Sequence, residues 1–238
     1  MDKRISVCAR ILIMDYFEEE QTEAEFMYDS DQIDEFETYI EETFGDFELV
    51  YHEIVSPDIH LDIIIVPPDE QENYYKLITM GAGAYEMDIP EEIQEYDLSR
   101  AEYIIYLPAQ WDLENESEEA YWPIRMLKDV ARLPLNTQTW LADGHTVYHS
   151  EDREPFANNT NLNSLVLLRR CDYDFTPLHF RFSSGEKINF YQLFPLYQEE
   201  LDYKWENDLE ALIDLFDDVR DFPLIHPNRL NRGKRTLN

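Results

Sequence analysis

SPDIHLDIIIVPP, at residues 56–68, predicts a core strand. Its first half alternates strictly between two kinds of residue: Asp58, His60 and Asp62 share one parity, and Ile59, Leu61 and Ile63 share the other. Because successive strand side chains point to opposite faces, this pattern predicts one polar and one apolar face. The apolar run ends at Pro67-Pro68, so we expect the strand to span His60–Val66.

The polar face of this strand has two interpretations. Side chains two residues apart lie about 6.6 Å apart on one face, so Asp58, His60 and Asp62 can supply metal ligands. Alternatively, they form the solvated or helix-covered side of a half-buried strand. The second interpretation is favoured, because no Cys or His with matching ligand spacing occurs elsewhere in the chain.

Further strands and helices interleave along the chain. We predict strands at residues 5–14, Leu49–Val55, Tyr74–Met80, Ala101–Leu107, Thr137–Tyr148, Ser164–Arg169, Leu178–Phe182 and Lys187–Leu193. One helix is capped by Ser30 or Asp31 and stops at Gly45, and the clearest helix, EEAYWPIRMLKDVARLP, stops at Pro134. A C-terminal helical stripe carries Trp205, Leu209, Leu212 and Phe216. Without βαβ regularity, this order predicts an α+β domain with a mixed sheet.

The net charge is the strongest compositional signal. The chain has 52 acidic and 19 basic residues and a formal charge of −33, with 44% hydrophobic residues to build a core. Such a surface repels nucleic acids and acidic membranes and favours cationic partners. No apolar run reaches the roughly 20 residues of a membrane span. The two cysteines, Cys8 and Cys171, lack metal-ligand spacing and indicate reduced thiols in the cytoplasm.

Other candidate motifs are incomplete. In WLADGHTVYHSED, a strand would separate His145 and His149 by about 13 Å, too far to share one ion, although Asp143 can orient His145. The glycines at 81–83 depart from a dinucleotide fingerprint. Arg229, Arg232, Lys234 and Arg235 indicate a solvated tail. The aromatic residues of the middle third are mainly core, with some as interface anchors: Tyr121, Trp122, Trp140, Tyr148 and Phe156.

Seven segments in order resemble the suppressor-of-fused (SUFU) domain family over residues 31–231: HLDIIIVPP, YYKLITMGAGAYEM, AEYIIYLPAQW, YWPIRMLKDVARLP, TWLADGHTV, EPFANNT and INFYQLFPLYQEELDYK. The resemblance is to single-domain bacterial members. It implies a compact domain with a mixed sheet and no established enzymatic activity. Eukaryotic relatives bind transcription factors of the Hedgehog pathway by clasping an extended peptide between two domains. For bacterial members the resemblance implies immunity proteins that neutralise polymorphic toxins.

We therefore predict an N-terminal extension at 1–28 (a strand plus an acidic linker), a SUFU-like domain at 29–222 and a basic tail at 223–238. The predicted function is a cytoplasmic, non-enzymatic protein that binds a basic toxin domain, without cofactor, metal, catalytic residues, nucleic acid or membrane. The predicted partner contacts are His60, Asp62, Trp140, Asp143, His145 and Phe156. Two alternatives remain: a metal-assisted hydrolase using His60/Asp62 or Asp143/His145, and a scaffold that binds client peptides by strand addition. The sequence leaves the oligomeric state open.

Overall fold

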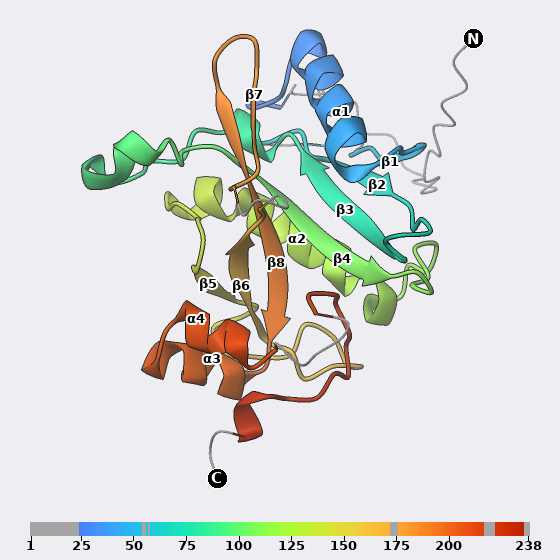
Figure 1. The fold of residues 1–238 in the computed structure, drawn as a ribbon, viewed down its shortest axis with the longest axis vertical. Helices are drawn as coiled ribbons and strands as arrows, with labels where there is room; N and C mark the ends of the chain where they lie inside the picture. Colours follow the sequence, from blue (N-terminus) through green and yellow to red (C-terminus); the bar gives the residue numbers. More distant parts are fainter. Residues whose placement is uncertain (1–23, 54–55, 57, 172–175, 217–221, 236–238) are drawn as a thin grey trace, which may run out of the picture.

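The computed structural model describes residues 24–53, 56, 58–171, 176–216 and 222–235. They form one mixed sheet in the order β1-β2-β3-β4-β8-β6-β5, with β7 paired to β8 beside this path (Figure 1). Only β4 and β8 run parallel among these described pairs. The strands are β1 (Leu49–Tyr51), β2 (Asp62–Val66), β3 (Tyr74–Met80), β4 (Ala101–Pro108), β5 (Thr146–Tyr148), β6 (Ser164–Arg169), β7 (His179–Arg181) and β8 (Lys187–Leu196). The predicted α+β class is confirmed, and the strand predicted at 5–14 lies outside the described residues.

Helices cover both faces of the sheet. α1 (Ser30–Phe44) packs on one face through Phe36, Ile40 and Phe44, and α2 (Glu118–Thr137) packs on the other. α3 (Gln198–Glu206) and α4 (Leu209–Asp214) lie at the lower end of β6 and β8 in Figure 1, where they bury Leu201 and Leu212. No helix in the described part of the chain is long and apolar enough to cross a membrane.

β2 is buried on both faces, contrary to the alternation in its sequence. Ile64 and Val66 pack under α1, whereas Ile63 and Ile65 join the core beneath α2. The strand begins at Asp62 instead of His60, and Asp62 is only 5% exposed. Of the two predicted environments, solvated or helix-covered, the burial of Asp62 agrees with the covered one, because helices cover both sides of a strand in the interior of the sheet.

The helix ends show local chemistry that the sequence predicted only in part. Asp29 caps α1, where Ser30 or Asp31 was the predicted cap, and it forms a reciprocal capping box with Gln32. Gly45 ends the helix with φ 114°. Pro134 does not end α2, which continues to Thr137. The last turn keeps its carbonyls bonded, since Thr137 Oγ1 donates to Leu133 at 2.7 Å. The strand predicted at Thr137–Tyr148 is consequently reduced to β5.

The predicted C-terminal stripe is broken between two short helices. α3 ends at Glu206 with Asn207 as its C-cap, and Asp208 caps α4 by accepting a hydrogen bond from the Ala211 backbone at 2.8 Å. This break changes the direction of the chain, so Leu212 and Phe216 are buried while Trp205 is 51% exposed. The expectation that Trp205 shares one stripe with Leu212 and Phe216 is therefore wrong.

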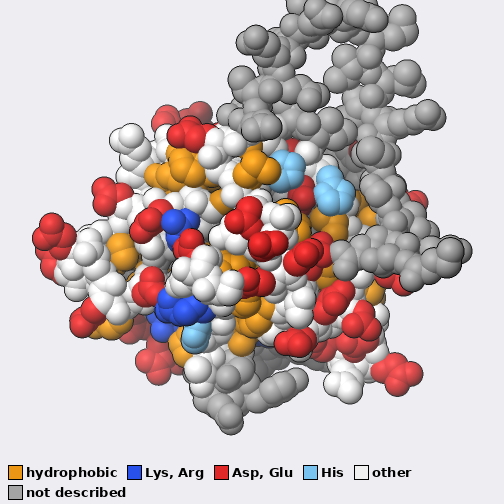
Figure 2. All heavy atoms as spheres, turned by 90° about the horizontal axis from the view of Figure 1, so that it is seen from above, with side chains coloured by type: hydrophobic (Ala, Val, Ile, Leu, Met, Phe, Trp, Pro, Cys, Tyr) orange, Lys and Arg blue, Asp and Glu red, His pale blue; other side chains and the backbone are white. Residues whose placement is uncertain are grey.

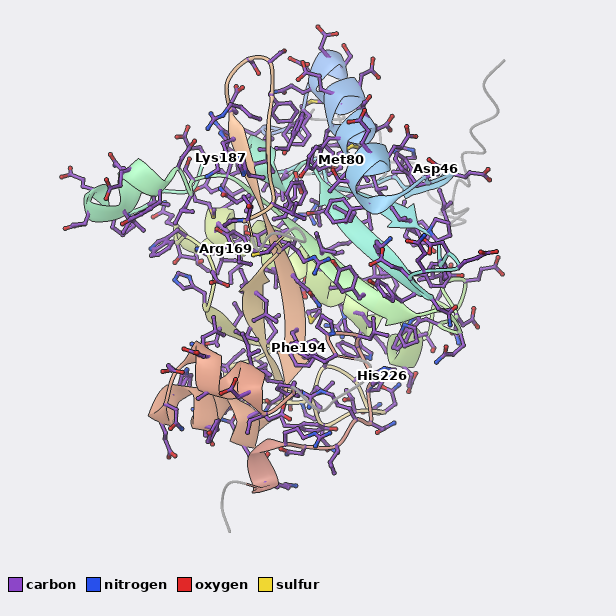
Figure 3. All side chains as sticks on the ribbon, viewed as in Figure 1. Asp46, Met80, Arg169, Lys187, Phe194 and His226 are labelled. Atoms are coloured by element: carbon purple, nitrogen blue, oxygen red, sulfur yellow. The ribbon has the colours of Figure 1, made fainter. Side chains whose placement is uncertain are left out.

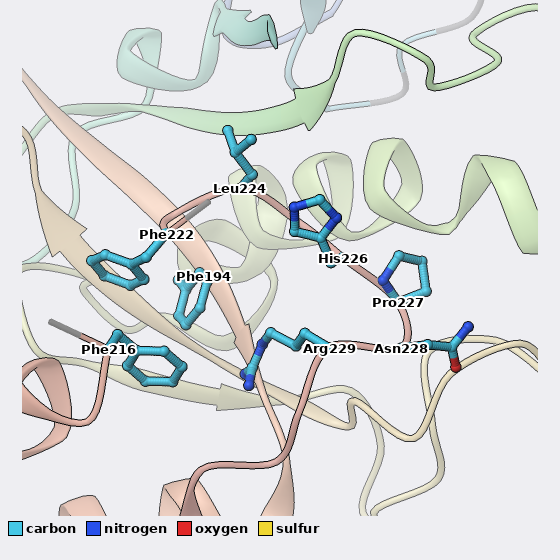
Figure 4. A pocket seen from close by; sticks show the side chains of 8 residues that line it. All are labelled: Phe194, Phe216, Phe222, Leu224, His226, Pro227, Asn228 and Arg229. Carbon is cyan, nitrogen blue, oxygen red and sulfur yellow. The ribbon is translucent and has the colours of Figure 1, made fainter. Parts of the chain in front are cut away.

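The segment after residue 221 is anchored to the domain. It runs past β8, where Figure 3 labels Phe194 and His226, and with the neighbouring rings it encloses a cavity of about 440 Å³ (Figure 4). Arg229 forms a bidentate ion pair with Glu200 of α3, and the two side chains are 10% and 0% exposed. The prediction of a solvated tail is wrong for Arg229, because its charge is matched by a buried carboxylate.

Candidate protein-binding site

Asp62 lies at the centre of a polar cluster where the chain enters β2. Its carboxylate accepts a hydrogen bond from the Glu53 backbone at 3.0 Å and from His52 Nδ1 at 2.9 Å. His60 Nε2 lies 3.5 Å from Asp62 Oδ1. The buried carboxylate thus holds the preceding loop in place.

Arg132 connects this cluster to α2, the helix on which it lies. Its guanidinium pairs with Glu53 and with Asp58, the latter at 3.1 Å, and also donates to the carbonyl of Ile59. Because these side chains satisfy one another, the cluster fixes α2 against the start of β2. We assign Asp62 a structural role, and its burial removes it from the predicted partner contacts.

A second cluster lies beside β5, at the far end of the sheet. Asp143 Oδ1 accepts a hydrogen bond from the Arg169 backbone at 2.7 Å, which closes the loop before β5 onto the end of β6. Gly144, with φ 78°, donates to Leu167 and makes the tight turn possible. The loop brings the rings of Trp140 and His145 to 4.3 Å in an edge-to-face arrangement.

Trp140, Gly144 and His145 line part of a cleft of about 590 Å³ next to an open strand edge. Trp140, His145 and Tyr148 contribute rings, and Lys204 of α3 closes the other side. In the described part of the chain β5 pairs with β6 alone, so its outer edge is free of a neighbouring strand. The cleft therefore combines aromatic surface with unpaired backbone groups, which suits an extended polypeptide.

The charges in this cleft are partly desolvated. Burial lowers the pKa of His145 from 6.5, and the nearby Lys204 lowers it further, against the opposing Trp140 backbone and Asp143. The lowered pKa of His145 favours the uncharged imidazole. Burial also lowers the pKa of Lys204, opposed by Asp143. A neutral imidazole beside a Trp ring makes this part of the cleft more apolar than its sequence implies.

The six predicted contact residues do not form one site. Trp140, Asp143 and His145 meet beside β5, whereas His60 and Asp62 lie five strand positions away, about 24 Å across the sheet. Phe156 is 4% exposed and stacks on Trp122 of α2, with ring centroids 5.1 Å apart. It belongs to the core, because the indole of α2 and the loop after β5 enclose it.

The arrangement combines aromatic rings with an unpaired strand edge. In the described residues, no three His, Cys, Asp or Glu side chains are placed to share a metal ion. Lys204 and Trp205 were not predicted for the site, since α3 follows β5 by about 50 residues and no sequence signal connects them. Only the tertiary contact between Tyr148 and Trp205 reveals their proximity.

Comparisons with known proteins identify the family of this domain. The family model "Suppressor of fused protein (SUFU)" matches residues 57–230, which is most of the chain. The chain belongs to the suppressor-of-fused family. An uncharacterized protein of Ureaplasma parvum serovar 3 is 26% identical over 167 residues, covering 70% of this chain and 77% of that protein.

Solved structures of suppressor-of-fused proteins share the fold. The crystal structure of the Sufu–Fu complex matches with a TM-score of 0.59 at 14% identity, covering 85% of this chain and 91% of that one. A homolog from Neisseria gonorrhoeae matches at 0.54 and 15% identity, covering 82% and 93%. Drosophila Suppressor of Fused matches at 0.56 and 13% identity, covering 90% of this chain and 54% of that longer one.

Proposed function

We propose that this suppressor-of-fused domain is a non-enzymatic immunity protein that binds and neutralises a cationic toxin in the cytoplasm. The observation that carries the proposal is the aromatic cleft beside the open edge of β5. Family membership supports a protein-binding role, since a structural relative was crystallised in the Sufu–Fu complex. An immunity protein needs only tight binding, for which a few aromatic anchors suffice.

The charge of the chain supports a cationic partner. Its formal charge is −33, and Figure 2 shows Asp and Glu side chains spread over the visible face with few Lys or Arg among them. A strongly negative protein attracts a basic domain over a distance and orients it before contact. Electrostatic attraction thus provides fast capture, and the cleft provides the close packing that slows release.

Replacing Trp140 with alanine is expected to weaken toxin binding at least tenfold, because a central aromatic anchor contributes more than about 1.4 kcal/mol. The test coexpresses this domain with the product of its neighbouring gene and measures toxicity, complex formation and affinity. Trp111→Ala is the matched control, since Trp111 is another half-buried indole, outside the cleft.

The same experiment has clear contrary outcomes. Wild-type association is expected to slow as salt rises, since long-range attraction is screened. Unrelieved toxicity without a complex would disprove the immunity role. Equal losses of affinity in the Trp140 and Trp111 variants would remove the cleft from the proposal.

The open edge of β5 favours a second candidate function, a scaffold that binds client peptides by strand addition. His145 accepts a hydrogen bond from Leu167 of β6, and His149 donates to Asn163. In an antiparallel ladder, residues of the other parity direct their backbone groups outward, here Thr146 and Tyr148. These groups are available to an added strand.

Thr146→Pro is expected to weaken the binding of an extended client peptide at least fivefold, because it removes an outward N–H without breaking the ladder to β6. Thr146→Val keeps that N–H and is the matched control. The measurement is competition between an isolated peptide from the partner and the folded partner. A peptide that fails to compete supports recognition of a folded toxin instead of strand addition.

A further inference from the structure

Trp205 is the exposed aromatic side chain that the fold leaves beside the cleft. It is 51% exposed on α3, and its ring meets Tyr148 of β5 edge-on with centroids 5.7 Å apart. Large apolar side chains in this position on a protein surface mark interaction sites when they adjoin other binding features. We name the surface formed by Tyr148, Arg153 and Trp205 the Trp205 surface.

This surface already holds one cation. The Arg153 guanidinium lies over the Tyr148 ring, 4.8 Å from its centroid. The ring of Tyr148 is thus occupied by Arg153 and Trp205, whereas Trp205 keeps half of its own surface in solvent. An indole face is the strongest aromatic acceptor for a guanidinium or ammonium group.

Carboxylates outnumber cations around the exposed indole. Six exposed acidic residues belong to the chain segments that carry the two rings, and none forms an ion pair with another described residue: Glu151, Asp152, Glu154, Glu206, Asp208 and Glu210. The neighbouring bases are Arg153 and Lys204, of which Lys204 lines the cleft. The local charge therefore complements a cationic segment and opposes a second copy of this acidic chain.

We infer that Trp205 is a docking site for a lysine or arginine side chain on an extended segment of a cationic partner protein. This inference rests on the proposed function and assigns it a surface. The partner's backbone would follow the edge of β5, and its cationic side chain would stack on the indole between two acidic chain segments. Continuity between the Trp205 surface and the cleft lets one segment use both.

The test uses the full chain and a fluorescein-labelled ten-residue peptide in which arginine alternates with valine, followed by fluorescence anisotropy at fixed ionic strength. Trp205→Ala is expected to weaken binding about tenfold, the loss of one partly desolvated cation–π contact. Trp205→Phe keeps a ring and is expected to lose less. A peptide with glutamate in place of arginine is expected not to bind.

Tyr96→Ala is the matched control. Tyr96 is 58% exposed and is flanked in the chain by Glu91, Glu92, Glu95 and Asp97. Arg181 pairs with Asp97, and Lys187 donates to the Tyr96 carbonyl. Tyr96 ends the short 3-10 helix Glu91–Tyr96, away from β5. Its variant is expected to bind the arginine peptide within twofold of wild type. Equal losses at Trp205 and Tyr96, or none at Trp205, would overturn the inference.

A charge reversal keeps the inference testable if removal of the indole unfolds α3. Glu206→Lys together with Glu210→Lys is expected to weaken the arginine peptide and to admit the glutamate peptide, and unchanged preference would overturn the inference. The toxin separates this inference from the proposed function. A toxin that binds wild type and Trp205→Ala equally disproves the inference alone, whereas a toxin that is never bound disproves the immunity role.

Discussion

Replacing Arg229 with alanine is expected to lower the free energy of unfolding by about 3–5 kcal/mol, because it leaves a buried charge without its partner. Glu200 is fully buried, and Arg229 meets both of its oxygens at 2.6 and 2.5 Å. The guanidinium also donates to the Pro195 carbonyl at 2.8 Å and lies 5.0 Å from the rings of Phe194, Tyr197 and Phe216. Urea denaturation measures the effect.

Arg181→Ala is the matched control for this prediction. It breaks an ion pair with Asp97 whose side chains are 53% and 46% exposed, so the expected change is below about 1 kcal/mol. The double variant Arg229→Met with Glu200→Met is expected to be more stable than Arg229→Ala, since it removes both charges. If Arg229→Ala and Arg181→Ala unfold at the same urea concentration, the buried pair does not anchor the C-terminal segment.

Replacing Glu102 with glutamine is expected to abolish a pH dependence of stability of about 3 kcal/mol. Glu102 is fully buried in β4 and accepts four hydrogen bonds, from Tyr28, Thr79, Gly81 and Gly83. A Cβ on Gly83 would lie 2.4 Å from the Tyr28 hydroxyl, so this set of hydrogen bonds to Glu102 requires a glycine at position 83. Tyr28 connects the segment before α1 to the sheet through this carboxyl group.

The direction of the pH effect follows from the pKa of Glu102. Burial raises that pKa from 4.5 to about 7, against the four hydrogen bonds, which favour the charged form. Between these values the folded chain keeps a proton that the unfolded chain has lost, so stability falls as pH rises from about 4.5 to 7. Glutamine does not titrate, and the difference between wild type and variant therefore changes over this interval.

The measurement is urea denaturation of wild type and Glu102→Gln at pH 4.5, 6 and 8. Wild type is expected to lose about 3 kcal/mol relative to the variant between the first and last pH. Glu92→Gln, at an exposed carboxylate of the 3-10 helix, is expected to change stability by less than about 0.5 kcal/mol at each pH. A constant difference for Glu102→Gln would show that the carboxyl stays charged throughout.

Local sequence patterns determined much of this fold. β3 and β6 have the predicted bounds, because their β-rich apolar runs are bordered by turns or polar residues. Gly45 ends α1 as expected, since a positive φ requires little strain at glycine. The seven ordered segments also indicated the family that the family model confirms. In the candidate site, Trp140, Asp143 and His145 were recognised because they follow one another along a single loop.

Tertiary structure alone decided the rest. The parallel pairing of β4 with β8 joins residues nearly 90 positions apart, and the sequence carries no local signal for it. Asp62 alternates like a solvated residue but is buried, because helices cover both faces of its strand. The sequence places Arg229 in a solvated tail, but in the structure it pairs with the buried Glu200. The sequence places Trp205 on the stripe of Leu212 and Phe216, but the break before α4 leaves it exposed. Periodicity specifies which side chains share a face, whereas burial and charge pairing depend on what the rest of the chain places against that face.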